Sequence, residues 1–278
     1  MASGGLTMTQ RSFSLAALTV LELSPLEMIE VAARAGYTHV GLRTEPATAE
    51  EHHFPLLADA GLRRATLDRL RDTGIKVLDI EILRLKPHTQ VAGFEPHLAF
   101  GAECGATELL VAGNDPDLPR CAQRFGELCE LAQGYGIHPH LEFMPWTDVP
   151  DLATAVNVVQ QAGHANGCIL VDAFHFNRSR SQLSQLEQLA PSRLRYAQLC
   201  DVAGPVPDNI ERILFEARHE RCLPGEGDCD LTGLLRALPP DIPLSLEIPT
   251  RRLMEQGVSA LERATRALEA TYRVLERL

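Results

Sequence analysis

The stretch HPHLEFMPWTDVPDLATAVNVVQQAGHANGCILVDAFHFNR, residues 138–178, decides the fold. It opens with an apolar run at 138–144 and closes with another at 168–172, both of strand length. Between them, 151–161 carries apolar residues at helical spacing and stops at Gly163, a residue type that commonly ends helices. A strand, a helix and a second strand in this order are typical of a parallel sheet with crossover helices.

The same alternation runs along the whole chain. Apolar runs of strand length occupy 13–18, 38–42, 76–83, 108–112, 138–144, 168–172, 195–199 and 243–248. Helical patterns occupy 25–35, 62–73, 120–133, 151–161, 231–238 and 258–278. Eight strands alternating with helices predict an α/β fold, the (β/α)8 TIM barrel. A doubly wound open sheet is the alternative, but no GxGxxG or GxxxxGK[ST] motif follows a strand, which weakens its nucleotide-binding versions.

Composition indicates a globular chain that does not bind polyanions. The 278 residues include 26 basic and 37 acidic side chains, a net charge of −11, and 45% are hydrophobic. Nucleic acids and anionic lipid surfaces reward clustered Lys and Arg, so we exclude both as partners. No apolar run reaches the roughly 18 residues of a membrane span. We expect one domain over residues 9–278, with Met8 as a candidate native start, and we leave homo-oligomer formation open.

Cysteine usage and the N-terminus indicate a cytoplasmic protein. The seven cysteines are odd in number and form no CxxC pair, which argues against a zinc ribbon and a disulfide scaffold. The first residues, MASGGLTMTQ, lack the basic start and apolar core of a secretory signal. We therefore expect reduced thiols and a cytoplasmic location.

Polar residues end the last four predicted strands. They are Glu142 in HLEFMPW, Asp172 in ILVDAFHFNR, Gln198 in YAQLCD and Glu247 in LSLEIP. In a barrel these strand ends meet at one rim, where the active site lies. Three buried carboxylates need compensating positive charge, which one divalent cation would supply. With the Gln198 amide oxygen they form an oxygen-rich set that favours Mn, Mg or Co, with Zn less favoured.

Each of these residues also has a purely structural interpretation. A carboxylate at a strand end can pair with an arginine instead, Gln198 can bond to loop backbone, and His175 can be an ordinary loop histidine. Glu81 and His140 are candidates to orient the ligands, and Asp201 is a candidate helix N-cap or orienting residue. The ordered set on four strands favours the metal interpretation.

Taken in order, LEF, VDxxH, QLxD and LEIP resemble the motifs of the xylose isomerase-like TIM-barrel superfamily of sugar isomerases and epimerases. The resemblance covers nearly the whole chain, from Phe13 to the last helix, as a single domain. It implies that Glu142, Asp172, Gln198 and Glu247 hold one divalent metal ion, and that Glu142, Glu247 and His175 are catalytic. The superfamily also contains apurinic endonucleases, but the extra histidine ligands of that branch are missing here.

The run RHERCLPGEG, residues 218–227, is similar to the 3-dehydroshikimate dehydratase branch of the same superfamily. That branch carries Arg-His-x-Arg before a Pro-Gly-x-Gly turn, and it resembles this chain in having glutamine at the position of Gln198, where many epimerases have histidine. The resemblance implies that Arg221 binds a substrate carboxylate, with His219 beside it. The serine that precedes the run in that branch is replaced by Ala217. The glycines alternatively form a turn that only shapes the loop.

Three further residues are substrate-binding candidates. Arg43 and Arg84 follow the second and third predicted strands, and Trp146 follows Glu142 by four residues. The arginines can converge on an anionic substrate, because a guanidinium holds a carboxylate or phosphate in a fork, or they can pair with barrel carboxylates such as Glu81. Trp146 either walls the pocket or packs in a loop. The segment 205–221 is unusually long for a connection, which favours a functional loop.

The resemblance implies a metal-dependent isomerase or epimerase acting on a small polyhydroxy carbonyl substrate. A proton alpha to the carbonyl would be abstracted, leaving a metal-stabilised enediolate, with Glu142 and Glu247 on opposite sides of the metal. A lyase resembling 3-dehydroshikimate dehydratase or inosose dehydratase is the first alternative, and His175 is then the better base because of its ordinary pKa. A barrel that binds a sugar or a metal without turnover is the second alternative.

Overall fold

The computed structural model describes residues 11–278, and its eight parallel strands close into a barrel in which β1 pairs with both β2 and β8. The strands are β1 Phe13–Leu15, β2 His39–Arg43, β3 Lys76–Leu85, β4 Glu108–Gly113, β5 His138–Glu142, β6 Cys168–Asp172, β7 Ala197–Leu199 and β8 Leu244–Leu246. The predicted (β/α)8 TIM barrel is confirmed, and the open sheet is excluded. Residue 9, where the predicted domain begins, and Met8 lie outside the described residues.

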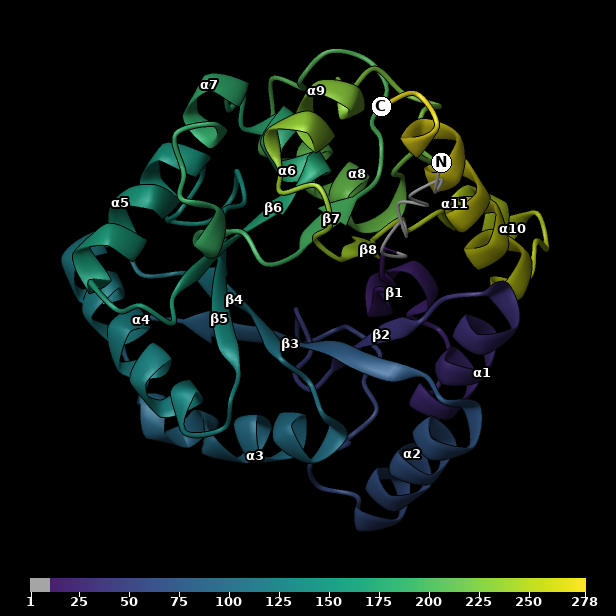
Figure 1. The fold of residues 1–278 in the computed structure, drawn as a ribbon, viewed down its shortest axis with the longest axis horizontal. Coiled ribbons are helices and arrows are strands. Elements are labelled where there is room, and N and C mark those ends of the chain that lie inside the picture. Colours follow the sequence, from purple (N-terminus) through teal and green to yellow (C-terminus); the bar gives the residue numbers. More distant parts are fainter. Residues whose placement is uncertain (1–10) are drawn as a thin grey trace, which may run out of the picture.

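Helices form an outer ring around the strands (Figure 1). They are α1 Pro25–Ala35, α2 Ala60–Thr73, α3 Glu95–Cys104, α4 Leu118–Gln133, α5 Leu152–Ala162, α6 Ala173–Arg178, α7 Leu183–Leu186, α8 Ile210–His219, α9 Leu231–Ala237, α10 Arg251–Glu255 and α11 Ala260–Leu275. Within residues 11–278, no helix has both the length and the apolar character needed to cross a membrane.

Local signals explain why helix α1 begins and ends where we predicted. The Ser24 side chain accepts a hydrogen bond from the backbone N–H of Glu27, and the Glu27 carboxylate accepts one from the backbone N–H of Ser24. Pro25 occupies the first helical position, and Gly36 ends the helix at a φ of 93°, which favours glycine.

Five helices that we did not predict lie in the connections, namely α3, α6, α7, α8 and α10, of which α3 and α8 are the longest. Helix α3 buries His97, Leu98, Phe100 and Gly101, a mixture of polar, apolar and small residues without a clear apolar stripe. Helix α8 occupies much of the 205–221 segment, which is therefore largely helical rather than an extended loop. Its C-terminal end brings Arg218 and His219 toward the barrel mouth, where they line a cavity.

The strands divide their apolar residues between two cores. Along β6, Ile169 and Val171 face outward into the large core that the helices cover, whereas Leu170 belongs to a smaller cluster with Leu110 and Tyr196. This alternation places the smaller cluster inside the barrel. Because all strands run parallel, their carboxyl ends share one rim above this interior cluster, and that rim carries the predicted site.

Candidate active site

The four strand-end residues come together at the rim. Glu142 and Asp172 end β5 and β6, Gln198 lies in β7 beside Asp172 in register, and Glu247 follows β8 directly. All four are buried. The Gln198 amide nitrogen lies 3.3 Å from Glu247 Oε1. Turned by 180°, the amide would place its nitrogen 2.9 Å from Glu142 Oε1 and 3.3 Å from Asp172 Oδ2. The amide is thus surrounded by carboxylate oxygens in either orientation.

His175 lies next to this group, in the first turn of α6. The Asp172 side chain accepts a hydrogen bond from the His175 backbone N–H at 3.0 Å and so caps the helix. His175 Nε2 is 3.6 Å from Glu142 Oε1, and its Nδ1 is buried without a hydrogen-bond partner among residues 11–278. One potential ligand atom of Glu142, one of Asp172 and one of His175 lie within 4.8 Å of one another. The Trp146 ring packs edge-on against the imidazole at 5.1 Å between centroids.

Burial changes the acid–base behaviour of these two groups. Burial, together with the negative charges of Glu247 and Asp172, raises the pKa of Glu142 well above its ordinary value. Burial and the positive charge of Arg221 lower the pKa of His175 to about 3. The imidazole is therefore neutral and weakly basic, which differs from the pKa near neutrality that an ordinary histidine has.

Arg221 enters the site as a direct partner of two strand-end carboxylates. Its Nη1 lies 2.8 Å from Asp172 Oδ2 and its Nη2 lies 2.8 Å from Glu247 Oε2. Nε donates to the Ala217 carbonyl at 3.0 Å, and the whole side chain is buried. The structural interpretation, pairing with an arginine, therefore holds for Asp172 and Glu247. The role predicted for Arg221 in binding a substrate carboxylate stays a prediction.

Charge and donor chemistry at the rim fit a divalent cation. Three buried carboxyl groups face one guanidinium, so their full ionisation would leave two negative charges without a cationic partner in the cluster. Among residues 11–278, Glu142 has no arginine or lysine within ion-pair distance, and its neighbours are His175 and the Gln198 amide. The donors Glu142, Asp172, Gln198 and Glu247 offer oxygen, with His175 nitrogen in reach, a set that suits a divalent metal ion.

A cavity of about 380 Å³ opens above the rim, which is within the range of small-molecule sites. It is lined by Glu142, His175 and Glu247 and by all five predicted substrate-binding residues, Arg43, Arg84, Trp146, His219 and Arg221. Arg218, Glu51 and His52 also line it and were not predicted from the sequence. Arg218 was visible in the RHER run, whereas Glu51 and His52 lie in a loop without a motif.

Arg43 and Arg84 differ in their partners. Arg43 lies 3.3 Å from Glu81 Oε2 and 3.4 Å from Glu51 Oε1, so it pairs with barrel carboxylates as the structural alternative expected. Arg84 Nη1 donates to the amide oxygen of Asn114 at 2.9 Å, and Arg84 has no carboxylate partner in the part of the chain that the structure describes. Glu81 is thus engaged by Arg43 and by the backbone N–H of Ala17.

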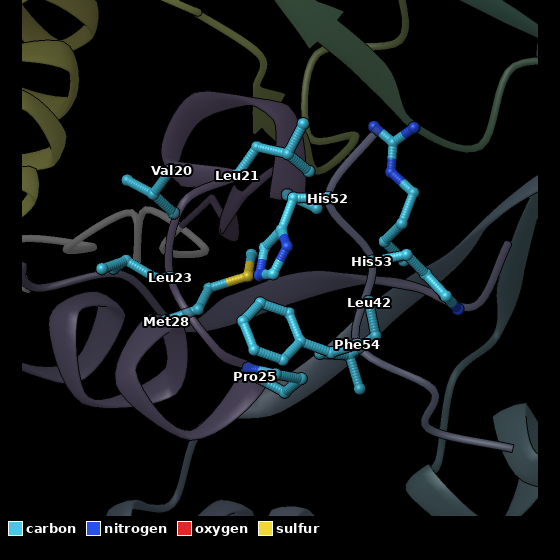
Figure 2. A pocket seen from close by; sticks show the side chains of 11 residues that line it. Val20, Leu21, Leu23, Pro25, Met28, Leu42, His52, His53 and Phe54 are labelled. Carbon is cyan, nitrogen blue, oxygen red and sulfur yellow. The ribbon is translucent and has the colours of Figure 1, made fainter. Parts of the chain in front are cut away.

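A small apolar pocket of about 30 Å³ adjoins the main cavity and shares Leu21, Arg43 and His52 with it. Figure 2 shows apolar side chains around the His52 imidazole, among them Met28 and Phe54. The His52 ring meets the Phe54 ring edge-on at 4.7 Å between centroids. This pocket has room for little more than one water or methyl-sized group.

His140 serves another part of the barrel. Its Nε2 lies 2.7 Å from Glu108 Oε2, and Glu108 also accepts from Arg195 at 2.9 Å. Its ring packs against Tyr196 at 4.6 Å between centroids. The hydrogen bond of His140 therefore points to the amino-terminal residue of β4, and no side-chain hydrogen bond joins it to Glu142 within residues 11–278.

Asp201 organises the loop after β7. Its carboxylate accepts hydrogen bonds from the backbone N–H groups of Val202, Gly225, Gly227 and Cys229, at 2.9 to 3.0 Å. A Cβ on Gly227 would lie 2.4 Å from the Val202 carbonyl oxygen. The Pro-Gly-x-Gly turn thus shapes the loop, with glycine required by the close approach, and Asp201 is the acceptor that fixes it.

Comparison with known proteins agrees with this architecture. The family model described as xylose isomerase-like TIM barrel matches residues 29–274. A 3-dehydroshikimate dehydratase of Pseudomonas putida is 29% identical over 116 residues, 38% of this chain and 18% of that protein. An inosose isomerase of Halalkalibacterium halodurans is 30% identical over 121 residues, 42% of this chain and 40% of that protein. The matches thus span less than half the length of these curated relatives.

Solved structures with the same fold cover nearly the whole chain. A structure of IolI protein with a bound zinc atom has a TM-score of 0.75 at 21% identity, over 96% of this chain and 98% of that one. A D-allulose 3-epimerase from Methylomonas sp. has a TM-score of 0.68 at 16% identity, over 95% of this chain and 97% of that one. With the family match extending over most of the described residues, the chain belongs to the xylose isomerase-like TIM barrel family.

Proposed function

We propose that this chain is a divalent-metal-dependent enzyme of the isomerase or epimerase type that removes a proton alpha to the carbonyl of a small polyhydroxy substrate. The single observation that carries the proposal is the convergence of Glu142, Asp172, Gln198 and Glu247, four buried oxygen donors from consecutive strands, at one rim of the barrel, where Glu142 and Glu247 line the cavity. The names of its relatives, inosose isomerase and D-allulose 3-epimerase, support this reaction class.

In this proposal the four strand-end residues hold the metal, which would supply positive charge to polarise the substrate carbonyl. Glu142 and Glu247 are the proton-transferring groups, because both line the cavity and come from different strands. His175, a neutral imidazole with a free Nδ1, donates to or accepts from a substrate oxygen. Trp146 walls the cavity beside His175 and limits the access of water.

A lyase of the dehydratase type is the second candidate. Two sequence features favour it, Gln198 in place of histidine and the Arg221-containing run, and a relative named 3-dehydroshikimate dehydratase supports it. In that reaction the proton leaves the alpha carbon and the hydroxyl leaves the neighbouring carbon as water. Cavity residues and metal ligands would be the same, so only product analysis separates the two reactions.

Metal content is the first test. We would compare bound metal by elemental analysis in the wild type, in Glu142→Gln and in the control Glu127→Gln, which changes an exposed carboxylate on α4. Each protein is purified without chelator and then offered Mn, Mg, Co and Zn, because zinc is bound in the IolI structure. We expect about one ion per chain in the wild type and the control, and a loss in Glu142→Gln.

Turnover is the second test. The metal-loaded protein is incubated in deuterium oxide with D-allulose, an inosose and 3-dehydroshikimate, and products are followed by NMR. Deuterium at the carbon next to the carbonyl, with a rate at least about 100-fold lower in Glu142→Gln, supports the isomerase or epimerase. Loss of water from 3-dehydroshikimate assigns the lyase instead. A metal-loaded protein that exchanges no deuterium and releases no water would leave the non-catalytic barrel as the function.

A further inference from the structure

The four arginines that line the cavity fall into two kinds. Arg43 and Arg221 are each held by two carboxylates, at distances of 2.8 to 3.4 Å. Arg84 and Arg218 have no carboxylate within ion-pair distance among the described residues, although both line the same cavity. Arg84 is half-buried, whereas Arg218 is an exposed residue of the cavity lining, so Arg84 is the partly buried arginine of this pair whose charge needs an explanation.

Arg84 is built into the cavity wall. It lies in β3 and is half-buried, and its Nη1 donates to the Asn114 side-chain oxygen at 2.9 Å. Asn114 follows β4, and its backbone N–H donates to the Leu85 carbonyl at 2.8 Å, which fixes the amide against β3. An amide oxygen orients a guanidinium but leaves its charge intact. The Arg84 Nε is buried and has no hydrogen-bond partner among the described residues, which leaves one donor of the side chain unsatisfied.

The electrostatic surroundings agree with this geometry. Burial lowers the pKa of Arg84, and the positive charges of Arg43 and Arg218 lower it further. The negative charge of Glu142 raises it. Arg218 is thus within electrostatic reach of Arg84, from the last turn of α8. Among the other carboxylates around the cavity, Glu51 and Glu81 pair with Arg43.

We propose that Arg84 and Arg218 form a subsite for an anionic substituent of the substrate, a carboxylate or a phosphate. A guanidinium binds either group through paired N–H donors, and two unneutralised guanidiniums in one cavity favour an anion over a neutral sugar hydroxyl. This inference rests on the proposed function, because it takes the carbonyl end of the same substrate to lie over Glu142 and Glu247. It moves anion recognition away from Arg43 and Arg221, whose charges are already compensated.

The test uses two matched pairs of probes on the full, metal-loaded chain. D-Gluconate and D-glucitol differ by one carboxylate, and D-fructose 6-phosphate and D-fructose differ by one phosphate. Affinities are measured by calorimetry at low and high salt. We expect the charged member of one pair to bind roughly ten- to a hundredfold tighter, as for a charge-assisted hydrogen bond, with an advantage that shrinks at high salt. The pair that shows this preference identifies the anion.

Three variants locate the effect. Arg84→Gln removes the charge, Asn114→Asp supplies a carboxylate of the same shape that neutralises Arg84, and Arg64→Gln changes an exposed arginine on α2 as the control. We expect the first two to lose the anion preference while keeping the affinity for the neutral probe, and the control to keep both. The inference is overturned if the two probes of each pair bind with equal affinity or if no probe binds. It is also overturned if Arg84→Gln keeps the preference for the anionic probe.

Metal content is determined on the same samples, which separates the two proposals. Wild type that holds metal but shows no anion preference refutes the subsite and leaves the proposed function standing. Wild type that holds no metal but prefers the anion, with the preference lost in Arg84→Gln, refutes the metal-dependent function and keeps the subsite.

Discussion

Replacing Arg221 by methionine should destabilise the metal-free protein and make it more responsive to divalent cations. The guanidinium lies 2.8 Å from an oxygen of Asp172 and 2.8 Å from an oxygen of Glu247, and it is buried. Methionine keeps much of the side-chain volume but leaves both carboxylates without their cation. If the proposed metal ion binds the same carboxylates, the metal ion and the guanidinium neutralise the same negative charges.

The expected magnitude follows from the burial of the pair. Removing one partner of a buried ion pair costs about 3–5 kcal/mol. With an unfolding entropy of about 2.1 cal/mol/K per residue, the 278 residues give about 0.6 kcal/mol/K, so the cost lowers Tm by about 5–9 °C. Arg221→Lys retains the charge without the two-pronged geometry and should lose less. Arg251→Met is the matched control, because its pair with Glu255 is exposed and should change Tm by no more than about 2 °C.

Thermal unfolding by calorimetry, with chelator and with saturating Mn, measures both effects. The rise in Tm on adding metal should be larger in Arg221→Met than in the wild type. In the variant no guanidinium neutralises the carboxylates, so the metal ion binds them more strongly. A metal-free Tm within about 1 °C of the wild type would refute the energetic role assigned to Arg221. Equal metal-induced rises in both proteins would refute the idea that cation and guanidinium neutralise the same groups.

Three further outcomes are expected. Divalent cation at about 100 times its Kd should stabilise the wild type by about 2.7 kcal/mol, reversed by chelator and missing in Glu142→Gln, as thermal unfolding would show. Asp201→Ala should cost at least about 3 kcal/mol in urea unfolding, because four backbone N–H groups lose their acceptor; a loss below about 1 kcal/mol would contradict this. Burial acts to raise the pKa of Glu108, but His140 and Arg195 hold it below its ordinary value. The ionised Glu108 therefore stabilises the fold above about pH 4.5, and this stabilisation is lost as the pH falls through the lowered pKa. The difference in unfolding free energy between the wild type and Glu108→Gln should therefore be large at neutral pH and small in acid.

The barrel was predictable because its signals are local. The strand at 168–172 matches β6 at both ends, and α1 matches 25–35, since an N-cap serine, a proline and a terminal glycine mark its limits. Predictions failed where tertiary contacts decide. The first strand stops at Leu15 rather than at residue 18, because a 3-10 turn over Ala17–Val20 follows it at the rim.

The strand-end residues were also predictable, because parallel topology alone brings Glu142, Asp172, Gln198 and Glu247 to one rim. The partner of each charge was not. Arg221 reaches Asp172 across 49 residues of sequence, and Arg84 meets an amide rather than a carboxylate through Asn114, 30 residues away. No local pattern records such pairings, because they depend on where loops return to the rim.

Sequence position and charge pairing therefore carry different information about function. Residue type and strand position indicate which groups can hold a metal ion. Whether each arginine is paired with a carboxylate of the protein indicates whether the substrate should carry an anionic group. By type and position alone, Arg43, Arg84 and Arg221 were equivalent candidates for binding an anion. Their partners separate them, since two are neutralised by the protein and one is held by a neutral amide with a donor unsatisfied. A residue that the fold positions but does not neutralise has charge left for a ligand, and on this ground Arg84 is the stronger candidate.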